Sequence, residues 1–339
     1  MLNSSVVLHP KFSINCSDDS NYWRLPQPSS RVFLSSLTAG YAAMLIIAIF
    51  ATVTIFILAA LHLYFVRHFV SSRSRRIPLY WLLGLFPVSS ACFLAGMMMP
   101  RAANFLFAIA WIYMMLCLIV LIETMKRLFG GRGEMSRLLI ENKQNISFRV
   151  PPCCCCCKCL PSIYPSEKNL RRVEWMVYQT VAVRIIITVI AITLIAEMQD
   201  DVERLITILT CLSTIQNISM LLAIFGCHTL VTLARERLGS FRMLALFRII
   251  DGTMGLFSLY DLFSNVLVKY NAFSCGPVLS KRGKSNYWYA FVLICGLSLM
   301  SCLATFLFHP RKSEIFDRHP CRSASQKTIA SMEETDHEK

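Results

Sequence analysis

The sequence predicts an all-α polytopic membrane protein, and three observations lead to that fold class. Apolar residues make up 55% of the 339-residue chain, and the mean hydropathy is +0.53. Charged residues make up only 16%, against roughly 25% in soluble domains, which is too few to cover a surface that faces water. Apolar runs of the about 20 residues that a spanning helix needs recur along the chain. The composition therefore excludes a soluble enzyme, a disordered chain and a fibrous protein.

Seven segments have the length and composition of spanning helices. They are Leu37–Val66, Pro78–Met99, Ala102–Met125, Trp175–Ile195, Leu205–Ala234, Met243–Val268 and Tyr287–Phe308. Four of the seven contain no Asp, Glu, Lys or Arg. We divide the chain into an extracellular segment 1–36, a helical domain 37–308 with a cytoplasmic loop 126–174, and a cytoplasmic tail 309–339.

The distribution of basic residues predicts an N-terminus outside the cell. Residues 1–36 contain no apolar run of the kind that forms a cleavable signal peptide, so we expect the first span to direct insertion. With the N-terminus outside, the inner segments carry 23 of the 34 Lys and Arg residues and the outer segments nine. Basic residues concentrate on the cytoplasmic side of membrane proteins. The net charge of +14 is thus mainly a topological signal, and it does not require a nucleic-acid partner.

Two features of the predicted outer segments fit an oxidising, glycosylating compartment. Asn3 and Asn15 begin Asn-x-Ser sequons, which mark N-glycosylation sites in exposed segments. Cys16 and Cys275 both fall outside and are candidates for a disulfide. Sequence spacing leaves open whether their Cα atoms lie close enough to be bridged.

The predicted cytoplasmic loop contains a run of six cysteines in seven positions. They are Cys153, Cys154, Cys155, Cys156, Cys157 and Cys159. Consecutive cysteines point in divergent directions and suit zinc poorly, because structural zinc sites pair cysteines two to four residues apart. A reducing cytoplasm disfavours disulfides. We therefore favour S-acylation, which attaches a loop to lipid at about 0.8 kcal/mol per buried methylene; a metal site and unmodified thiols remain the alternatives.

A few charges lie inside the predicted spans, where a charged side chain costs about 2.5–3.5 kcal/mol. Arg184 lies near the middle of the fourth span, and Arg248, Asp251 and Asp261 lie in the sixth. A guanidinium in an apolar groove can bind a carboxylate or sulfate through two hydrogen bonds. The structural alternative is that Arg184 pairs with Asp261, since Arg248 and Asp251 are three residues apart and can satisfy each other. A histidine in an apolar helix, such as His228, is more often a hydrogen-bonded interior residue than a ligand.

Four local features give the chain a resemblance to a known family. They are Met99-Pro100-Arg101 between two spans, Glu123 before Phe129-Gly130-Gly131, the cysteine run after a proline, and Gln179 five residues before Arg184. The chain resembles the alpha subunits of organic solute transporters over about residues 40–310, with arginine at 184 where the family has lysine. The resemblance implies a seven-span plasma-membrane transporter that moves bile acids, steroid conjugates and similar amphipathic anions. It also implies a single-span beta subunit as partner. On this basis the candidate substrate-binding residues are Arg184, Asp251, Asp261, Gln179 and Glu123.

A seven-span chain could have functions other than transport, and the sequence motifs bear on each of them. A G-protein-coupled or chemosensory receptor is the main alternative, although the third span ends in Glu123-Thr-Met-Lys126-Arg127 without the acidic-Arg-aromatic motif of the large receptor class. A membrane-shaping or trafficking protein attached by its acylated loop is a third possibility. Gly283-Lys284-Ser285 lacks a glycine at the spacing of a phosphate-binding loop. Hydrolase and metalloenzyme motifs are also absent from the sequence. We therefore expect that the protein is not an enzyme and that it binds no cofactor or metal.

Overall fold

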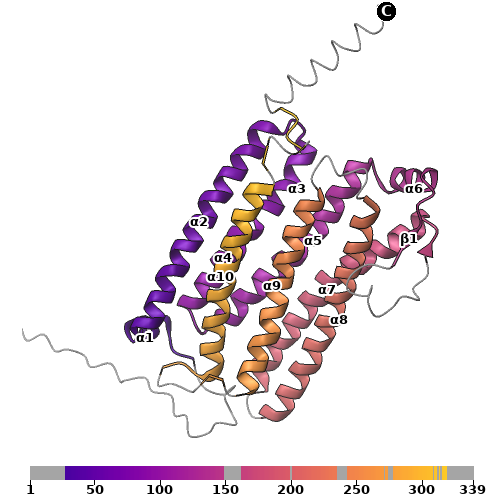
Figure 1. Ribbon diagram of the computed structural model, residues 1–339. Coiled ribbons are helices and arrows are strands. Elements are labelled where there is room, and N and C mark those ends of the chain that lie inside the picture. Colours follow the sequence, from indigo (N-terminus) through magenta and orange to yellow (C-terminus); the bar gives the residue numbers. More distant parts are fainter. Residues whose placement is uncertain are drawn as a thin grey trace, which may run out of the picture.

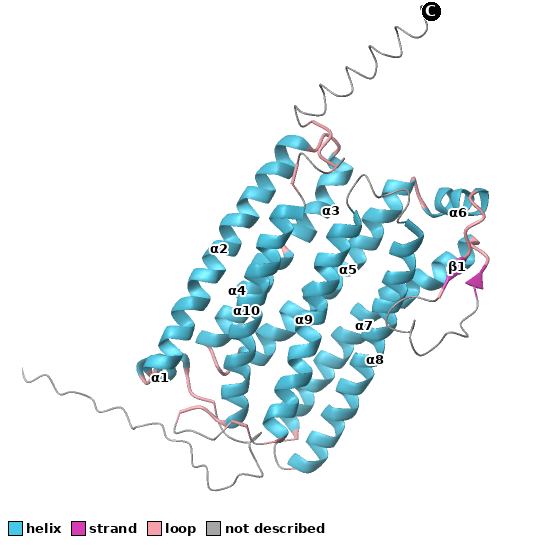
Figure 2. Cartoon of the chain, in the orientation of Figure 1, coloured by secondary structure: helices cyan, strands magenta, loops and turns pink. Residues whose placement is uncertain are grey.

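The computed structural model describes residues 27–148, 162–198, 201–234, 243–270, 272–273, 278–307, 309–310, 313 and 315–318. Within these ranges the fold is a bundle of long helices with one short β-ribbon (Figure 1, Figure 2). The helices are α1 (Ser30–Ser35), α2 (Ala39–Phe69), α3 (Arg73–Leu83), α4 (Leu85–Met98), α5 (Ala103–Phe129), α6 (Arg132–Glu141), α7 (Glu167–Glu197), α8 (Val202–Ala234), α9 (Met243–Lys269) and α10 (Lys281–Leu307). The ribbon pairs β1 (Ile146–Ser147) with β2 (Ser162–Ile163) in antiparallel register.

Six helical segments in the described part of the chain are long and apolar enough to cross a membrane. They are Ala39–Phe69, Arg73–Met98, Ala103–Phe129, Glu167–Glu197, Glu203–Ala234 and Lys281–Leu307. Each overlaps one of the predicted spans, so the all-α membrane fold is confirmed, with six of the seven spans. The predicted sixth span corresponds to α9, a 27-residue helix that lies within the bundle but is not among these six.

The second predicted span is not one continuous helix, because it divides at Gly84 into α3 and α4. Pro87 has no N–H for the carbonyl four residues earlier, that of Leu83, and a proline ring clashes with that carbonyl in a regular helix. Gly84 also lets α5 approach closely: a Cβ at this position would overlap the Tyr113 hydroxyl. That hydroxyl donates a 2.9 Å hydrogen bond to the Trp81 carbonyl. The break is therefore stabilised by α5.

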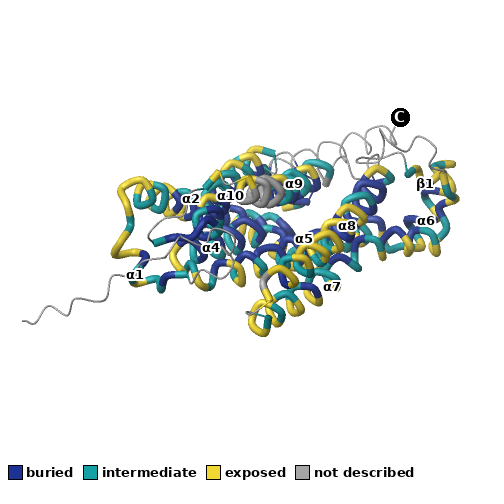
Figure 3. The backbone as a smooth tube through the Cα atoms, turned by 90° about the horizontal axis from the view of Figure 1, so that it is seen from below, coloured by how far each residue is buried: buried dark blue, intermediate teal, exposed yellow. Residues whose placement is uncertain are grey.

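The helices pack as a larger group and a pair that meet at α5. The larger group has α10 against α2, α4 and α9, with α5 packed on α4. In the pair, α7 and α8 pack mainly on each other, and α7 also contacts α5 (Figure 3). Buried aromatic rings fill the interior next to α5, with centroids 5.2–5.7 Å apart; they are Phe93, Phe107, Trp111, Phe257 and Tyr289. The side of α5 that faces α4, α9 and α10 is thus built from aromatic side chains.

The motif Phe129-Gly130-Gly131 ends α5 and starts α6. Gly130 has φ +87° and Gly131 has φ +117°, a region that side chains disfavour. The N–H groups of Gly130 and Gly131 donate to the carbonyls of Arg127 and Lys126 at 3.1 and 3.0 Å, which closes the last turn of α5. The two glycines therefore produce the sharp turn that sends α6 away from the bundle.

Three cytoplasmic elements of the predicted topology gather at one end of the bundle, opposite to α1 (Figure 1). They are α6, the β-ribbon and the described tail residues 313 and 315–318. Phe148, which follows β1, stacks on Phe225 of α8 with ring centroids 5.7 Å apart. The chain after α10 folds back so that Ile315 and Phe316 are buried and the Arg318 N–H donates to the Phe69 carbonyl at 3.1 Å. This arrangement is consistent with the predicted pairing of the loop and the tail on one side of the membrane.

Candidate functional site

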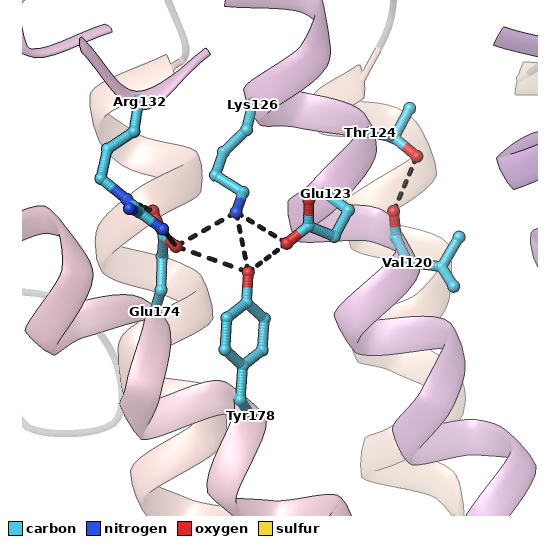
Figure 4. Close-up of polar contacts among 7 residues, drawn as sticks. All are labelled: Val120, Glu123, Thr124, Lys126, Arg132, Glu174 and Tyr178. Carbon is cyan, nitrogen blue, oxygen red and sulfur yellow. Dashed lines mark hydrogen bonds and ion pairs between the residues drawn. The ribbon is translucent and has the colours of Figure 1, made fainter. Parts of the chain in front are cut away.

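Two polar assemblies lie in the bundle, and the first joins α5, α6 and α7 (Figure 4). We call it the charged cluster: Glu123, Lys126, Arg132, Glu174 and Tyr178. Arg132 donates from Nε and Nη2 to the two carboxylate oxygens of Glu174 at 2.8 and 2.6 Å. Lys126 Nζ lies 2.6 Å from Glu123 Oε1, 3.1 Å from Glu174 Oε2 and 2.9 Å from the Tyr178 hydroxyl. The Tyr178 hydroxyl also donates to Glu123.

The charged cluster balances two cations against two carboxylates. The hydrogen bond to Glu174 is the largest influence on the pKa of Arg132, and it raises that pKa above the ordinary value despite the opposing effect of burial. Glu174 is the centre of the cluster, with a side chain only 2% exposed. Glu123, a predicted substrate-binding candidate, accepts bonds from Lys126 and Tyr178 within the protein. The contacts indicate that the cluster fixes the ends of three helices.

The second assembly surrounds Arg184, eighteenth of the 31 residues of α7. Its Nη1 donates to Gln216 Oε1 on α8 at 3.1 Å. Its guanidinium carbon lies 4.5 Å from the centre of the Trp111 ring on α5, a cation–π contact. The Trp111 indole N–H in turn donates to the Tyr289 hydroxyl of α10 at 3.2 Å. Arg184 is therefore held by side chains from two other helices and connected through Trp111 to a third.

A recess adjoins Arg184 between α5, α7 and α8. It offers about 200 Å³ of empty space, its open mouth included. Its lining combines two polar side chains and one hydroxyl with apolar ones: Met115, Thr180, Val183, Arg184, Gln216 and Met220. Pockets that enclose a whole drug-sized ligand run to about 300–1,000 Å³. The closed part of the recess measures only about 10 Å³, the space of about one water molecule, so in this conformation a head group must displace some of the lining side chains to enter.

The other predicted site residues do not gather around Arg184. Gln179 donates at 3.5 Å to the Ser219 carbonyl, so it joins α7 to α8. Asp251 lies 3.3 Å from His228 Nε2. The expectation that Arg248 and Asp251 satisfy each other is wrong, because Arg248 is exposed and Asp251 turns toward α8 instead. The side chain of Asp261 lies outside the described part of the structure.

Two residues of this region escaped sequence analysis as site residues. Trp111 and Gln216 carry no signal of their own, since an aromatic and an amide in a span read as packing residues. Their contacts with Arg184 of α7 arise from the packing of the helices, which the sequence does not give. The expectation that His228 is an interior, hydrogen-bonding residue is confirmed: its side chain is 9% exposed and contacts Asp251.

Several predicted sites fall outside the described residues. These are the acylation candidates Cys153, Cys154, Cys155, Cys156, Cys157 and Cys159, the sequon residues Asn3 and Asn15, and the disulfide candidates Cys16 and Cys275.

The bundle and the Arg184 assembly define a multi-pass membrane protein with a cation held at mid-helix beside a recess of mixed polar and apolar lining. Comparison with known families extends this class. The family model described as organic solute transporter Ostalpha matches residues 43–313, and the chain belongs to this family of membrane transporters of organic solutes. No solved structure matches the chain.

Curated relatives agree with the family. Organic solute transporter alpha-like protein 3 of Caenorhabditis elegans is 37% identical over 337 residues, which cover 99% of this chain and 94% of that protein. Alpha-like protein 2 of the same organism is 33% identical over 301 residues, covering 88% of this chain and 87% of that protein. Organic solute transporter subunit alpha of Bos taurus is 25% identical over 288 residues, covering 83% and 84% of the two chains. The comparisons give no support to a receptor.

Proposed function

We propose that the protein mediates facilitated movement of amphipathic organic anions, such as bile acids or steroid conjugates, and that the Arg184 assembly binds their anionic head group. The observation that carries this proposal is the guanidinium at mid-helix, next to Gln216, Trp111 and an apolar recess. A planar guanidinium suits a carboxylate or sulfate through paired hydrogen bonds. The Met and Val side chains of the recess suit the apolar atoms next to that group.

The driving force in this proposal is the gradient of the substrate itself. The test is bidirectional flux of a labelled steroid sulfate in cells that express the protein together with a candidate single-span beta subunit. We expect net movement to follow the gradient in both directions. Absence of flux from a protein that reaches the surface would refute transport and favour the receptor or membrane-shaping alternatives.

The competing role for Arg184 is structural pairing with Asp261, as the sequence suggests. Arg184→Ala and Arg184→Lys separate the two roles when flux is measured beside surface abundance. Direct binding predicts that the alanine variant reaches the surface but loses transport, with partial recovery in the lysine variant. Structural pairing predicts that abundance and transport fall together, and that Asp261→Asn lowers abundance as well. Normal transport by a well-expressed alanine variant would exclude the substrate role.

We further propose that α9 is the sixth of seven spans, with the N-terminus outside, the tail cytoplasmic and the protein in the plasma membrane. The distribution of Lys and Arg supports this orientation. Glycosylation at Asn3 and Asn15 and a Cys16–Cys275 disulfide follow from the same topology. Loss of the glycan mass shift on Asn3→Gln with Asn15→Gln tests it, and an unchanged mass in the double variant would contradict the outside N-terminus.

Acylation of the cysteine run is part of the proposed attachment to lipid. The run lies between Phe148 and Ser162, and Phe148 stacks on Phe225 of the membrane helix α8. Thirteen residues separate these two points. Because Ser162 pairs with Ser147 in the β-ribbon, both ends of the segment start close to the bundle. Labelling of thioester-linked acyl groups, with the six cysteines replaced by serine, tests the proposal. Unchanged labelling in the serine variant would remove it.

A further inference from the structure

The side-chain amide of Gln216 lies at the mouth of the recess beside Arg184. The buried lining residues form the inner wall of the recess; they are Met115, Thr180 and Met220. The half-buried lining residues form its mouth; they are Val183, Arg184 and Gln216. At the mouth, the 3.1 Å hydrogen bond from Arg184 Nη1 to Gln216 Oε1 joins α7 to α8. This hydrogen bond therefore bridges the opening of the recess.

The guanidinium of Arg184 has an anchor that does not depend on Gln216. The Trp111 ring, whose centre is 4.5 Å from the guanidinium carbon, belongs to a residue that is 5% exposed. That ring packs on Phe257 with centroids 5.3 Å apart, and its N–H donates to the Tyr289 hydroxyl at 3.2 Å. Because Trp111 is fixed by two other helices, Arg184 keeps this contact when Gln216 leaves.

Gln216 is the movable partner of the Arg184–Gln216 hydrogen bond. It is half-buried, and its neighbours in the chain, Ile215 and Asn217, are both exposed. Side chains that reach the surface change rotamer within picoseconds to nanoseconds. A turn of the Gln216 side chain away from Arg184 therefore needs no displacement of α8.

The amide oxygen of Gln216 presents to Arg184 the same kind of acceptor as an anionic head group does. A guanidinium donates to an amide oxygen, a carboxylate oxygen or a sulfate oxygen through the same N–H groups. A hydrogen bond to an anion is roughly twice as strong as a neutral one. An anion therefore gains by replacing the amide, whereas a neutral acceptor exchanges one neutral bond for another. The closed space of about 10 Å³ is too small to hold the amide and a head group together.

We propose that Gln216 is an internal ligand of Arg184, which the anionic head group of the solute must displace and which returns to Arg184 when the solute leaves. Gln216 is then a specificity-determining residue, because displacement of its amide favours a charged head group over a neutral one. It also weakens binding, which suits movement in both directions, since a transported solute must leave as readily as it enters. The identity of the solute rests on the proposed function, whereas the occupation of Arg184 by Gln216 does not.

The reactivity of Arg184 tests the internal ligand without any solute. The probe is 4-hydroxyphenylglyoxal, an arginine-selective reagent, applied to the purified full chain, and modification is read by mass spectrometry on peptides that contain Arg184. Gln216→Leu removes the acceptor, and Gln216→Glu replaces it with a carboxylate. The matched control is Asn217→Leu, because Asn217 also carries an amide but does not line the recess.

We expect modification of Arg184 to be about 2- to 12-fold faster in Gln216→Leu than in the wild type, the range that corresponds to one neutral hydrogen bond. It should be slower in Gln216→Glu, because a carboxylate holds the guanidinium more strongly, and unchanged in Asn217→Leu. Equal rates in Gln216→Leu and the wild type would overturn the proposal. If Gln216→Leu fails to accumulate, Gln216→Glu decides, since a rate at or above that of the wild type contradicts the proposal.

Equilibrium binding of a labelled steroid sulfate then separates competition from assistance. The internal ligand predicts a Kd about 2- to 12-fold lower in Gln216→Leu than in the wild type, and a higher Kd in Gln216→Glu. An equal or higher Kd in Gln216→Leu would show that Gln216 does not compete with the solute, and would overturn the proposal. If the modification rates follow the prediction but steroid sulfate neither binds nor protects Arg184 in any variant, the internal ligand is retained and the proposed substrate class is contradicted.

Discussion

Replacing Glu174 by glutamine removes the central carboxylate of the charged cluster. The side chain of Glu174 is 2% exposed, while those of Arg132 and Lys126 are 26% and 12% exposed. Glutamine keeps the size of the side chain but accepts through one oxygen, so the two cations lose their shared negative partner. Removing one member of a buried ion pair typically costs about 3–5 kcal/mol. Because Arg132 reaches water and Lys126 keeps Glu123 at 2.6 Å, we expect the lower end, about 3 kcal/mol.

The assay is thermal unfolding of purified protein in detergent, in which size-exclusion chromatography measures the folded fraction that remains after heating. We expect the midpoint of Glu174→Gln to fall by on the order of 5 °C. The matched control is Glu141→Gln, because Glu141 pairs with Arg137 at 3.6 Å with both side chains more than half exposed. Exposed pairs contribute at most about 1 kcal/mol. A midpoint for Glu174→Gln equal to that of Glu141→Gln would refute the view that the cluster fixes the helix ends.

Two further predictions concern the tail and the packing of α4. Burial tends to raise the pKa of the Asp317 carboxyl, but hydrogen bonds from Ser71 and the nearby Arg75 lower it overall. Docking of residues 315–318 is therefore expected to be complete near neutral pH and to weaken as pH falls below the ordinary carboxyl pKa of about 3.9. Asp317→Asn should increase proteolysis of the tail several-fold at pH 7, and equal cleavage rates would contradict this. Gly96→Ala should destabilise by about 1–3 kcal/mol, since a Cβ would overlap the Phe107 ring. The control is Gly40→Ala, where a Cβ meets nothing within 4 Å. Equal thermal midpoints for Gly96→Ala and Gly40→Ala would contradict this prediction, because they would show that α4 and α5 move apart at little cost.

Much of the fold could be predicted because hydropathy is a property of each segment alone. All six membrane-length helices coincide with predicted spans. The predicted ends are less accurate where helices extend beyond the bilayer. The fourth span was predicted to begin at Trp175, whereas α7 begins at Glu167 after the N-cap Ser166. This placed Glu174 in a loop and concealed the charged cluster.

The candidate site could be predicted only in part. Arg184 is visible in the sequence because a charge in an apolar run is costly. Its neighbours Trp111 and Gln216 depend on which helices pack together, and no local pattern encodes that choice. Spacing alone also misled the interpretation of Asp251, because a three-residue separation permits a pair with Arg248 but does not exclude a nearer partner such as His228 on another helix.

Equilibrium binding of a labelled steroid sulfate to purified protein, wild type against Arg184→Gln, tests the proposed head-group site most directly. A charge-assisted hydrogen bond contributes about 1.5–3 kcal/mol. We therefore predict a Kd about 10- to 150-fold higher for Arg184→Gln, with an unchanged size-exclusion profile. A neutral steroid should bind both proteins alike. An unchanged Kd for the steroid sulfate in a folded Arg184→Gln variant would contradict the account.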